Sequence, residues 1–315
     1  MQATEDLFSM IVDPLPLEGA FVSAWRTGGD WSFAGPREAC ALFHYVEEGS
    51  MAIDIGHPNA TTPLNQGDLA IFPHGGAHRI GSSTPALSVA LEQILPSRRK
   101  GGFVRVEIPG ADGPALFLCA GLHCGGHAST PLYKLLPELI VIRKHQIERE
   151  PVLQGTIDGL LQEVERFHVG SSFALLRGLE LIYVLGLRVA LEVESATTSM
   201  SRALRDPRIA NALLYMHTEF KERSTVAGIA SSAGMSRSAF SLAFRQATGC
   251  APARYLSKVR VSNAQALMRT TRLSREEIAH RVGYESTVGL YLALRSTRSS
   301  LGRHLDDRYQ VQDAG

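Results

Sequence analysis

Three histidines suggest a chemical site. The stretch "GDLAIFPHGGAHRI", Gly67 to Ile80, contains His74 and His78, and His44 lies upstream in "ALFHYVEEGSMAIDIG". Neutral imidazole is a common ligand of zinc, iron and copper. Three interpretations stay open: a metal-dependent catalytic centre, with a divalent metal on His44 and His78 and His74 as a weaker third ligand; a pocket in which these histidines bind a small molecule; or histidines that are hydrogen-bonded only within the fold.

A second cluster, "CAGLHCGGH", brings Cys119, His123, Cys124 and His127 within nine residues. It allows a zinc site, a redox-sensing thiol, or two small cysteines in a core or a turn. With Cys40 and Cys250 the chain has four cysteines, too few and too scattered for a disulfide framework. The start of the chain does not resemble a secretion signal, and no apolar run approaches the ~18 residues that span a bilayer. We therefore expect a cytoplasmic protein with reduced thiols.

The charge is unevenly distributed along the chain. Residues 1–200 hold 14 basic and 22 acidic residues, a balance of −8, whereas residues 201–315 hold 18 and 9, a balance of +9. This asymmetry favours an acidic module joined to one that binds a polyanion, although a basic solvated face would look the same.

Two different sequence patterns indicate which secondary-structure elements position these residues. Residues 20–118 alternate short apolar runs with turn residues, which predicts many short strands in a barrel or sandwich. After Pro131 the pattern becomes helical, and "SSFALLRGLELIYVLGLRVALEVE" is apolar nearly all round. Such a helix is either buried against its own barrel or forms a dimer contact. The polar segment Glu194 to Pro207 is predicted to be a linker.

The C-terminal part contains an internal repeat. "IASSAG" followed by "SRSAFSLAFR" is matched by "IAHRVG" followed by "STVGLYLALR". Each unit has the layout of a helix-turn-helix, with small Ala230 and Ala279 where the helices cross and Gly234 and Gly283 in the turns. Helix caps are predicted at four hydroxyl residues, Thr225, Ser236, Ser274 and Ser286.

The second helix of each unit is the candidate reading helix. Phe240 and Phe244 form the back of the first, which leaves polar residues to face a DNA major groove. The predicted DNA contacts are Ser236, Arg237, Ser238, Ser241 and Arg245 in the first unit and Ser286, Thr287, Tyr291 and Arg295 in the second. The first unit is expected to read bases and the second, with Arg298, to hold phosphates. A degenerate, poorly folded tail is the alternative for the second unit.

These motifs resemble known families. Residues 208–305 are similar to the DNA-binding domain of the AraC/XylS regulators, through "TVAGIASSAGMSRSAFSLAFRQATGCAPARYL" and "RVSNAQALMRTTRLSREEIAHRVGYES". The resemblance implies that the two units enter successive major grooves. It weakens after Ser286, where this chain lacks the family's aromatic-rich helix and serine-proline ending.

The histidine stretch resembles the second conserved motif of the cupin barrels, and "FHYVEEGSMAI" resembles a reduced first motif. The resemblance implies that His44 and His78 point into one cavity. Enzymatic cupins commonly supply two or three histidines and a carboxylate, so the reduced motif favours a sensor over a catalyst.

The predicted fold is α+β and multidomain. A cupin-like β-barrel sensor spans 1–145, a helical connector and dimerisation region 146–205, and an all-α double helix-turn-helix domain 206–308. The predicted function is sequence-specific transcriptional regulation, in which the barrel senses a small molecule, a metal or an oxidant. Expected partners are promoter DNA, a second copy of the chain, an unidentified effector and, as a candidate, RNA polymerase, with no membrane. Two alternatives remain, a cupin-type metal enzyme fused to a DNA-binding domain and a regulator whose barrel only dimerises.

Overall fold

A computed structural model describes residues 2–12, 17–56, 61–82, 88–95, 101–110, 114–124, 130–192, 199–221 and 225–297. The chain forms two compact units. We call Val12–Ala128 with Leu136–Ala196 the sheet unit, and Met1–Ile11, Ser129–Leu135 and Thr197–Gly315 the helical unit. The predicted combination of a β-rich N-terminal part and an all-helical C-terminal part is confirmed.

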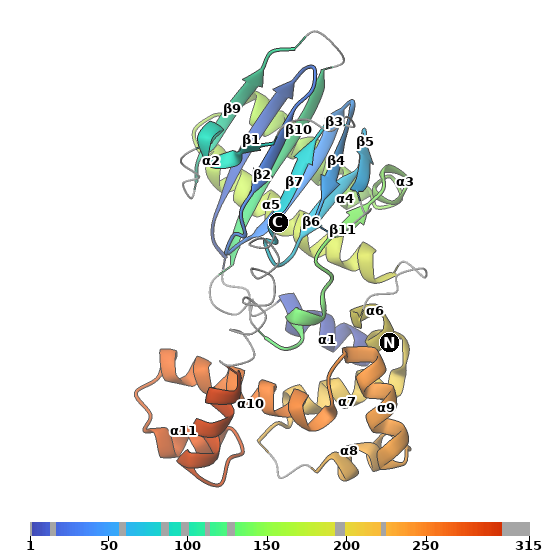
Figure 1. Cartoon of the computed structure of the whole chain (residues 1–315), viewed down its shortest axis with the longest axis vertical. Helices are drawn as coiled ribbons and strands as arrows, with labels where there is room; N and C mark the ends of the chain where they lie inside the picture. Colours follow the sequence, from blue (N-terminus) through green and yellow to red (C-terminus); the bar gives the residue numbers. More distant parts are fainter. Residues whose placement is uncertain are drawn as a thin grey trace, which may run out of the picture. The chain divides into compact units, whose positions relative to one another are not determined.

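The sheet unit contains two sheets that lie face to face (Figure 1). The six-stranded sheet has the order β11-β6-β3-β10-β1-β9 and the five-stranded sheet the order β5-β4-β7-β2-β8. This arrangement is a jelly-roll-like sandwich; among the described strands the two sheets do not join into one closed barrel. The strands are β1 (Leu17–Thr27), β2 (Ser32–Gly35), β3 (Ala41–Glu48), β4 (Ser50–Asp54), β5 (Thr61–Asn65), β6 (Leu69–Phe72), β7 (His78–Gly81), β8 (Val89–Ala90), β9 (Phe103–Ile108), β10 (Ala115–Cys124) and β11 (Ile140–Ile142).

An aromatic cluster fills the space between the sheets. Trp25 on β1 stacks on Phe117 on β10 with ring centroids 5.8 Å apart, and Trp31 stacks on the same ring at 5.0 Å. Phe33 on β2 lies 5.0 Å from Trp25. Because side chains alternate between the two faces of a strand, each sheet contributes its inward set to this core.

Two helices, α4 (Pro151–Arg166) and α5 (Ser171–Glu192), cover the outer face of the six-stranded sheet (Figure 1). Leu179, Ile182 and Tyr183 of α5 are buried, and Tyr183 meets Phe43 of β3 edge-on at 5.8 Å. Much of the apolar surface of α5 is therefore covered within its own unit. A dimer contact on the remainder, which includes Phe173, stays a prediction. Short helices α2 (Leu91–Ile94) and α3 (Lys144–Ile147) complete the unit.

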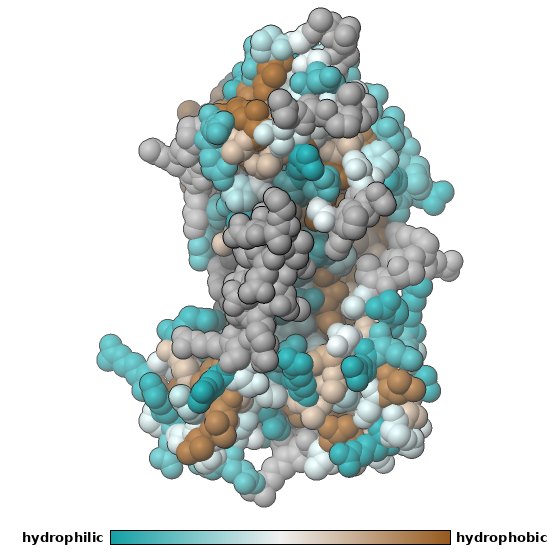
Figure 2. All heavy atoms as spheres, in the orientation of Figure 1, coloured by the Kyte–Doolittle hydropathy of each residue, from teal (hydrophilic) through white to brown (hydrophobic). Residues whose placement is uncertain are grey.

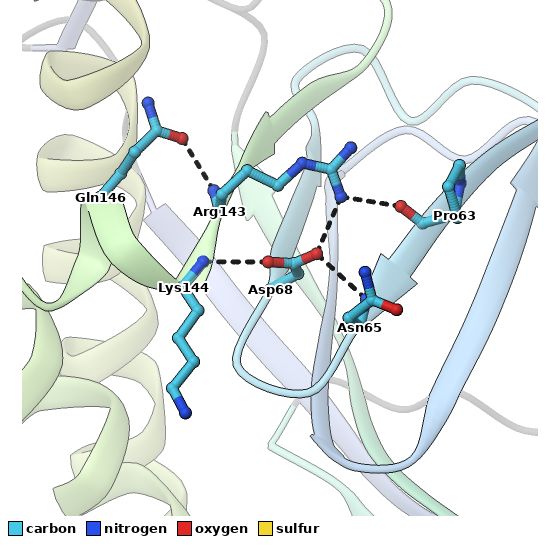
Figure 3. Close-up of polar contacts among 6 residues, drawn as sticks. All are labelled: Pro63, Asn65, Asp68, Arg143, Lys144 and Gln146. Atoms are coloured by element: carbon cyan, nitrogen blue, oxygen red, sulfur yellow. Dashed lines mark hydrogen bonds and ion pairs between the residues drawn. The ribbon is translucent and has the colours of Figure 1, made fainter.

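A buried carboxylate joins the sandwich to these helices (Figure 3). Asp68, in the turn between β5 and β6, accepts hydrogen bonds from the backbone N–H of Asn65 at 3.0 Å and of Lys144 at 2.9 Å. It also forms an ion pair of 2.8 Å with Arg143, which in turn donates to the carbonyl of Pro63. The start of α3 is thus tied to the β5–β6 turn by charge-assisted hydrogen bonds.

The helical unit begins with α1 (Gln2–Val12) and a 3-10 turn (Tyr133–Leu135) and continues from α6 to the C-terminal helices. The polar segment that we predicted to be a linker instead contains α6 (Ser199–Arg205), with Met200 and Ala203 buried. Its Asp-Pro pair starts the next helix: Asp206 caps it and Pro207 occupies the first turn, where a missing N–H costs nothing. The remaining elements are α7 (Pro207–Thr218), α8 (Val226–Ser232), α9 (Arg237–Thr248), α10 (Pro252–Thr270), α11 (Arg275–Arg281) and a helix over residues 287–297.

The internal repeat is confirmed as two helix-turn-helix units, α8–α9 and α11 with the helix at 287–297. Gly234 and Gly283 have φ of 66° and 82°, a conformation that side chains disfavour. Ala230 and Ala279 are each 1% exposed, as the close helix crossing requires. Thr225, Ser236 and Ser274 accept the predicted capping hydrogen bonds, and Ser286 accepts one from Gly289 N–H at 3.2 Å.

The second unit is folded as far as residue 297. Leu290 is 2% exposed and packs with Ala264, Ile278, Ala279 and Val282. The alternative of a poorly folded tail is therefore wrong for these residues, while Arg298 lies outside the described part of the chain. No described helix has both the length and the apolarity needed to cross a membrane.

Candidate ligand cavity and nucleic-acid interface

Two of the three predicted histidines meet across the sandwich. His44 lies on β3 of the six-stranded sheet and His78 on β7 of the five-stranded sheet, and their Nε2 atoms are 2.7 Å apart. On the other side of its ring, His44 Nδ1 lies 2.9 Å from Sγ of Cys119. Register explains this contact, because His44 and Cys119 are directly paired residues on β3 and β10.

The hydrogen bonds define the tautomers of both rings. His78 Nδ1 lies 2.7 Å from the carbonyl oxygen of Gly76, which only accepts, so this nitrogen carries the proton. In neutral His78 the Nε2 atom is then an acceptor, so Nε2–H of His44 donates to it. His44 Nδ1 in turn accepts from the thiol of Cys119. The three side chains form one directed chain of hydrogen bonds that joins the sheets.

Burial keeps this chain uncharged. It lowers the pKa of His44 well below its usual range, with His78 as a second cause, and lowers the pKa of His78 as well. Burial also raises the pKa of the Cys119 thiol strongly. A buried group avoids its charged form because the low-polarity surroundings do not solvate it. Cys119 is therefore a neutral thiol, which does not favour the redox-sensing interpretation, since reactive cysteines depend on thiolate character.

A small cavity of about 30 Å³ lies beside these residues. Apart from His44, His78, Cys119 and Ser23, its lining is almost entirely apolar. Ser23 is already engaged, because it accepts from the indole N–H of Trp25 at 2.8 Å and donates to the Cys119 carbonyl. The apolar lining includes Phe21, Trp25, Phe33, Leu42, Ile80 and Leu95.

The structure does not bring His74 to this cavity. Its Nε2 atom instead lies 3.0 Å from the carbonyl oxygen of Leu136. Sequence spacing did not reveal this, because His74 lies between β6 and β7, where side chains do not follow the regular alternation of a strand.

The donor set at the cavity does not fit a tight metal site. Nδ1 of each histidine is occupied, so only the two Nε2 atoms could bind a metal, and Cys119 is on the opposite side of the His44 ring. Among the described residues no group of three or more possible ligands occurs, whereas zinc usually needs at least three from the protein. Of the predicted cysteine cluster, the side chain of Cys124 and all of His127 lie outside the described part of the chain.

The first candidate reading helix, α9, has one buried apolar face and one exposed, largely polar face, as a helix that binds in a DNA groove needs. Phe240 and Phe244 are fully buried behind it, while Arg237, Ser238 and Arg245 are exposed. Two of its predicted contact residues have other hydrogen bonds: Ser236 caps the helix, and the half-buried Ser241 donates to the Arg237 carbonyl at 2.8 Å. Arg237 is the first residue of the helix and so lies at the end that approaches base edges in such motifs.

The second candidate reading helix exposes the predicted Ser286, Thr287, Tyr291 and Arg295. Tyr291 is 58% exposed. α10 carries the two units: Tyr255 packs on Phe244 of the first with ring centroids 5.4 Å apart, and Ala264 belongs to the core of the second.

Sequence reasoning missed three residues at these sites. Cys119 was assigned to a local cysteine cluster, because its pairing with His44 depends on a strand register that only the folded sheet fixes. Leu242 and Leu292 are exposed on the two reading helices, although no leucine was among the predicted DNA contacts. Their identical place in the repeat was the available signal.

These observations define a DNA-binding protein in which a duplicated helix-turn-helix follows a jelly-roll sandwich with an internal cavity. A family model described as Cupin matches residues 6–192, and one described as Helix-turn-helix domain matches residues 229–300. The chain belongs to the AraC/XylS family of transcriptional regulators and carries its cupin domain ahead of the DNA-binding domain.

Two relatives align with most of this chain. The HTH-type transcriptional regulator AlkR of Acinetobacter baylyi is 23% identical over 95% of this chain and 98% of its own length. The HTH-type transcriptional regulator MtrA of Neisseria gonorrhoeae is 24% identical over 89% of this chain and 91% of its own. Among solved structures, the DNA-binding domain of AdpA in complex with a target DNA is 30% identical over 32% of this chain and 96% of its own length, with a TM-score of 0.28.

Proposed function

We propose that this regulator reads promoter DNA mainly through α9 and responds to a small molecule that enters the cavity between the sheets. The observation that carries the first part is the exposed Arg237 at the start of a helix whose back is fully buried. The second helix, with Arg295 and the helix N-terminus at Ser286, is proposed to hold phosphates.

The sensor proposal rests on the His44–His78 hydrogen bond, which is a bridge between the two sheets. Ligand pockets typically measure about 300–1,000 Å³, so a cavity of about 30 Å³ must expand to admit a ligand. A molecule that hydrogen-bonds one histidine would replace the bridge and let the sheets separate. Because the lining is apolar and its polar groups are uncharged, the effector is proposed to be uncharged and largely apolar, with one hydrogen-bonding group.

A contact within the sheet unit connects the cavity strand β3 with α5. Phe43 lies on the opposite face of β3 from His44 and contacts Tyr183 of α5. In the sequence, α5 precedes the DNA-binding domain. We expect a ligand that displaces β3 to move α5 as well, and so to shift the equilibrium between two conformations of the regulator.

Replacing Arg237 by alanine tests the reading helix. We expect specific affinity for a selected DNA site to fall by about 1–3 kcal/mol, because a bidentate contact to a base edge is lost. Affinity would be measured by fluorescence anisotropy at fixed salt on the selected site and on a scrambled one. Arg79→Ala in the sheet unit is the control for loss of one positive charge. Equal losses on both DNA sequences would contradict base reading by Arg237.

A panel of short alcohols, phenols and primary amides tests the sensor. Trp25 and Trp31 are the only tryptophans and both lie in the sheet unit, so their fluorescence reports its thermal unfolding. We expect at least one compound to stabilise this unit, by about 2.7 kcal/mol at a hundredfold excess over its Kd. His44→Leu and His78→Leu should remove the effect, and exposed Val152→Ala should retain it. Stabilisation that persists in both histidine variants would contradict the proposed site.

We further propose a homodimer that acts in the cytoplasm, with RNA polymerase as a candidate partner and no enzymatic activity of its own. Support for a non-catalytic role comes from the cavity, whose histidines are engaged with each other rather than directed at an open position. The division into a sensor at 1–145, a connector at 146–205 and a DNA-binding domain at 206–308 also stays a proposal.

A further inference from the structure

The two reading helices present the same apolar residue at the same place. Leu242 is 61% exposed and Leu292 is 58% exposed, and the two positions are related by the offset that also relates Ser236 to Ser286 and Arg245 to Arg295. The same offset relates two buried residues on the backs of these helices, Phe240 and Leu290, which are 0% and 2% exposed.

Each leucine lies in the middle of the outward face of its helix. Residues three or four apart share one face, so Ser238 and Arg245 flank Leu242, and Val288 and Arg295 flank Leu292. A single exposed leucine needs no explanation on a protein surface. Leu242 and Leu292, however, occupy equivalent positions on two helices of a DNA-binding domain, and each lies one turn from an arginine. This repetition indicates that both leucines make the same kind of contact. Figure 2 shows hydrophobic side chains reaching the surface of the helical unit among hydrophilic ones.

We propose that Leu242 and Leu292 each contact the 5-methyl group of a thymine in the major groove. This inference rests on the proposed use of α9 and the helix at 287–297 for DNA reading. The thymine methyl is the one apolar group on the base edges of that groove, and apolar side chains recognise it by direct contact. The arginines provide the neighbouring phosphate or guanine contact.

The proposal predicts a feature of the operator. α10, which separates the two units, has 19 residues and so measures about 28 Å along its axis. Two reading helices that enter successive major grooves are one helical turn of DNA apart, about 10–10.5 base pairs. The preferred site should therefore hold a thymine in each half-site, at equivalent positions separated by about one turn.

The test begins with selection of binding sites by the full-length protein from a random DNA library. Each preferred thymine is then replaced by deoxyuridine, which removes only the methyl group. We expect the wild-type protein to lose affinity about fourfold per methyl, the value of one buried carbon. The DNA affinity of Leu242→Ala should not change when deoxyuridine replaces thymine in one half-site, but should still fall when the replacement is in the other. Leu292→Ala should show the reverse pattern. Met268→Ala, which removes an exposed apolar side chain of α10, should respond like the wild type.

The outcomes separate this inference from the proposed function. Selection of no specific site would overturn both. A specific site that requires Arg237 but tolerates deoxyuridine, or leucine variants that keep the wild-type sensitivity, would overturn the thymine contact alone. So would leucine variants that bind DNA normally and fail only in reconstituted transcription, because the leucines would then contact a protein.

Discussion

Replacing Asp68 by alanine should lower the free energy of unfolding of the sheet unit by about 3 kcal/mol. Removal of one partner of a largely buried ion pair typically costs about 3–5 kcal/mol, and here the half-exposed Arg143 can recover some hydration. The backbone N–H groups of Asn65 and Lys144 would also lose their charged acceptor. Urea unfolding followed by tryptophan fluorescence would measure the change.

Two further variants give the Asp68 prediction its controls. Asp68→Asn keeps the shape and one acceptor oxygen and should cost less than the alanine variant. Arg79→Ala breaks the exposed Arg79–Asp54 pair and should change stability by less than about 1 kcal/mol. If Asp68→Ala were as mild as Arg79→Ala, the carboxylate would not be what joins the β5–β6 turn to α3.

The largest expected effect is on the helical unit, where Phe244→Ala should cost about 3–5 kcal/mol of stability. Phe244 is 0% exposed and contacts two aromatic rings, with centroids 5.5 Å from Phe240 and 5.4 Å from Tyr255. Its loss leaves a cavity behind α9, so specific DNA binding should fail at a lower temperature. Circular dichroism of the helices and DNA binding over a temperature series would measure both.

The same variant has an internal control. Because both tryptophans lie in the sheet unit, their fluorescence transition should be nearly unchanged in Phe244→Ala. Leu242→Ala, a truncation on the opposite, exposed face of the same helix, should leave helix stability within about 0.5 kcal/mol of wild type. A fluorescence transition that shifts with the helical one would show that the two units unfold together and would contradict this separation.

The DNA-binding part was the more predictable half, because its determinants are local in sequence. Ala230, Gly234 and their counterparts in the repeat specify a close crossing and a turn within a few residues of each other, and the capping serines mark where helices begin. The apparent linker was mispredicted for a similar local reason. The polar composition of Glu194 to Pro207 did not reveal that Met200 is buried in α6, or that Asp206 and Pro207 begin the helix α7.

The cavity was less predictable, because its contacts are made between strands. The sequence by itself determined that His44 and His78 belong to a sandwich and that a duplicated helix-turn-helix follows. Only the tertiary structure decided that His44 pairs with Cys119, faces His78 across the two sheets and leaves His74 outside. A shift of one residue in strand register reverses every side chain, so these partners, and with them the charge and chemistry of the site, are fixed by long-range pairing rather than by spacing along the chain.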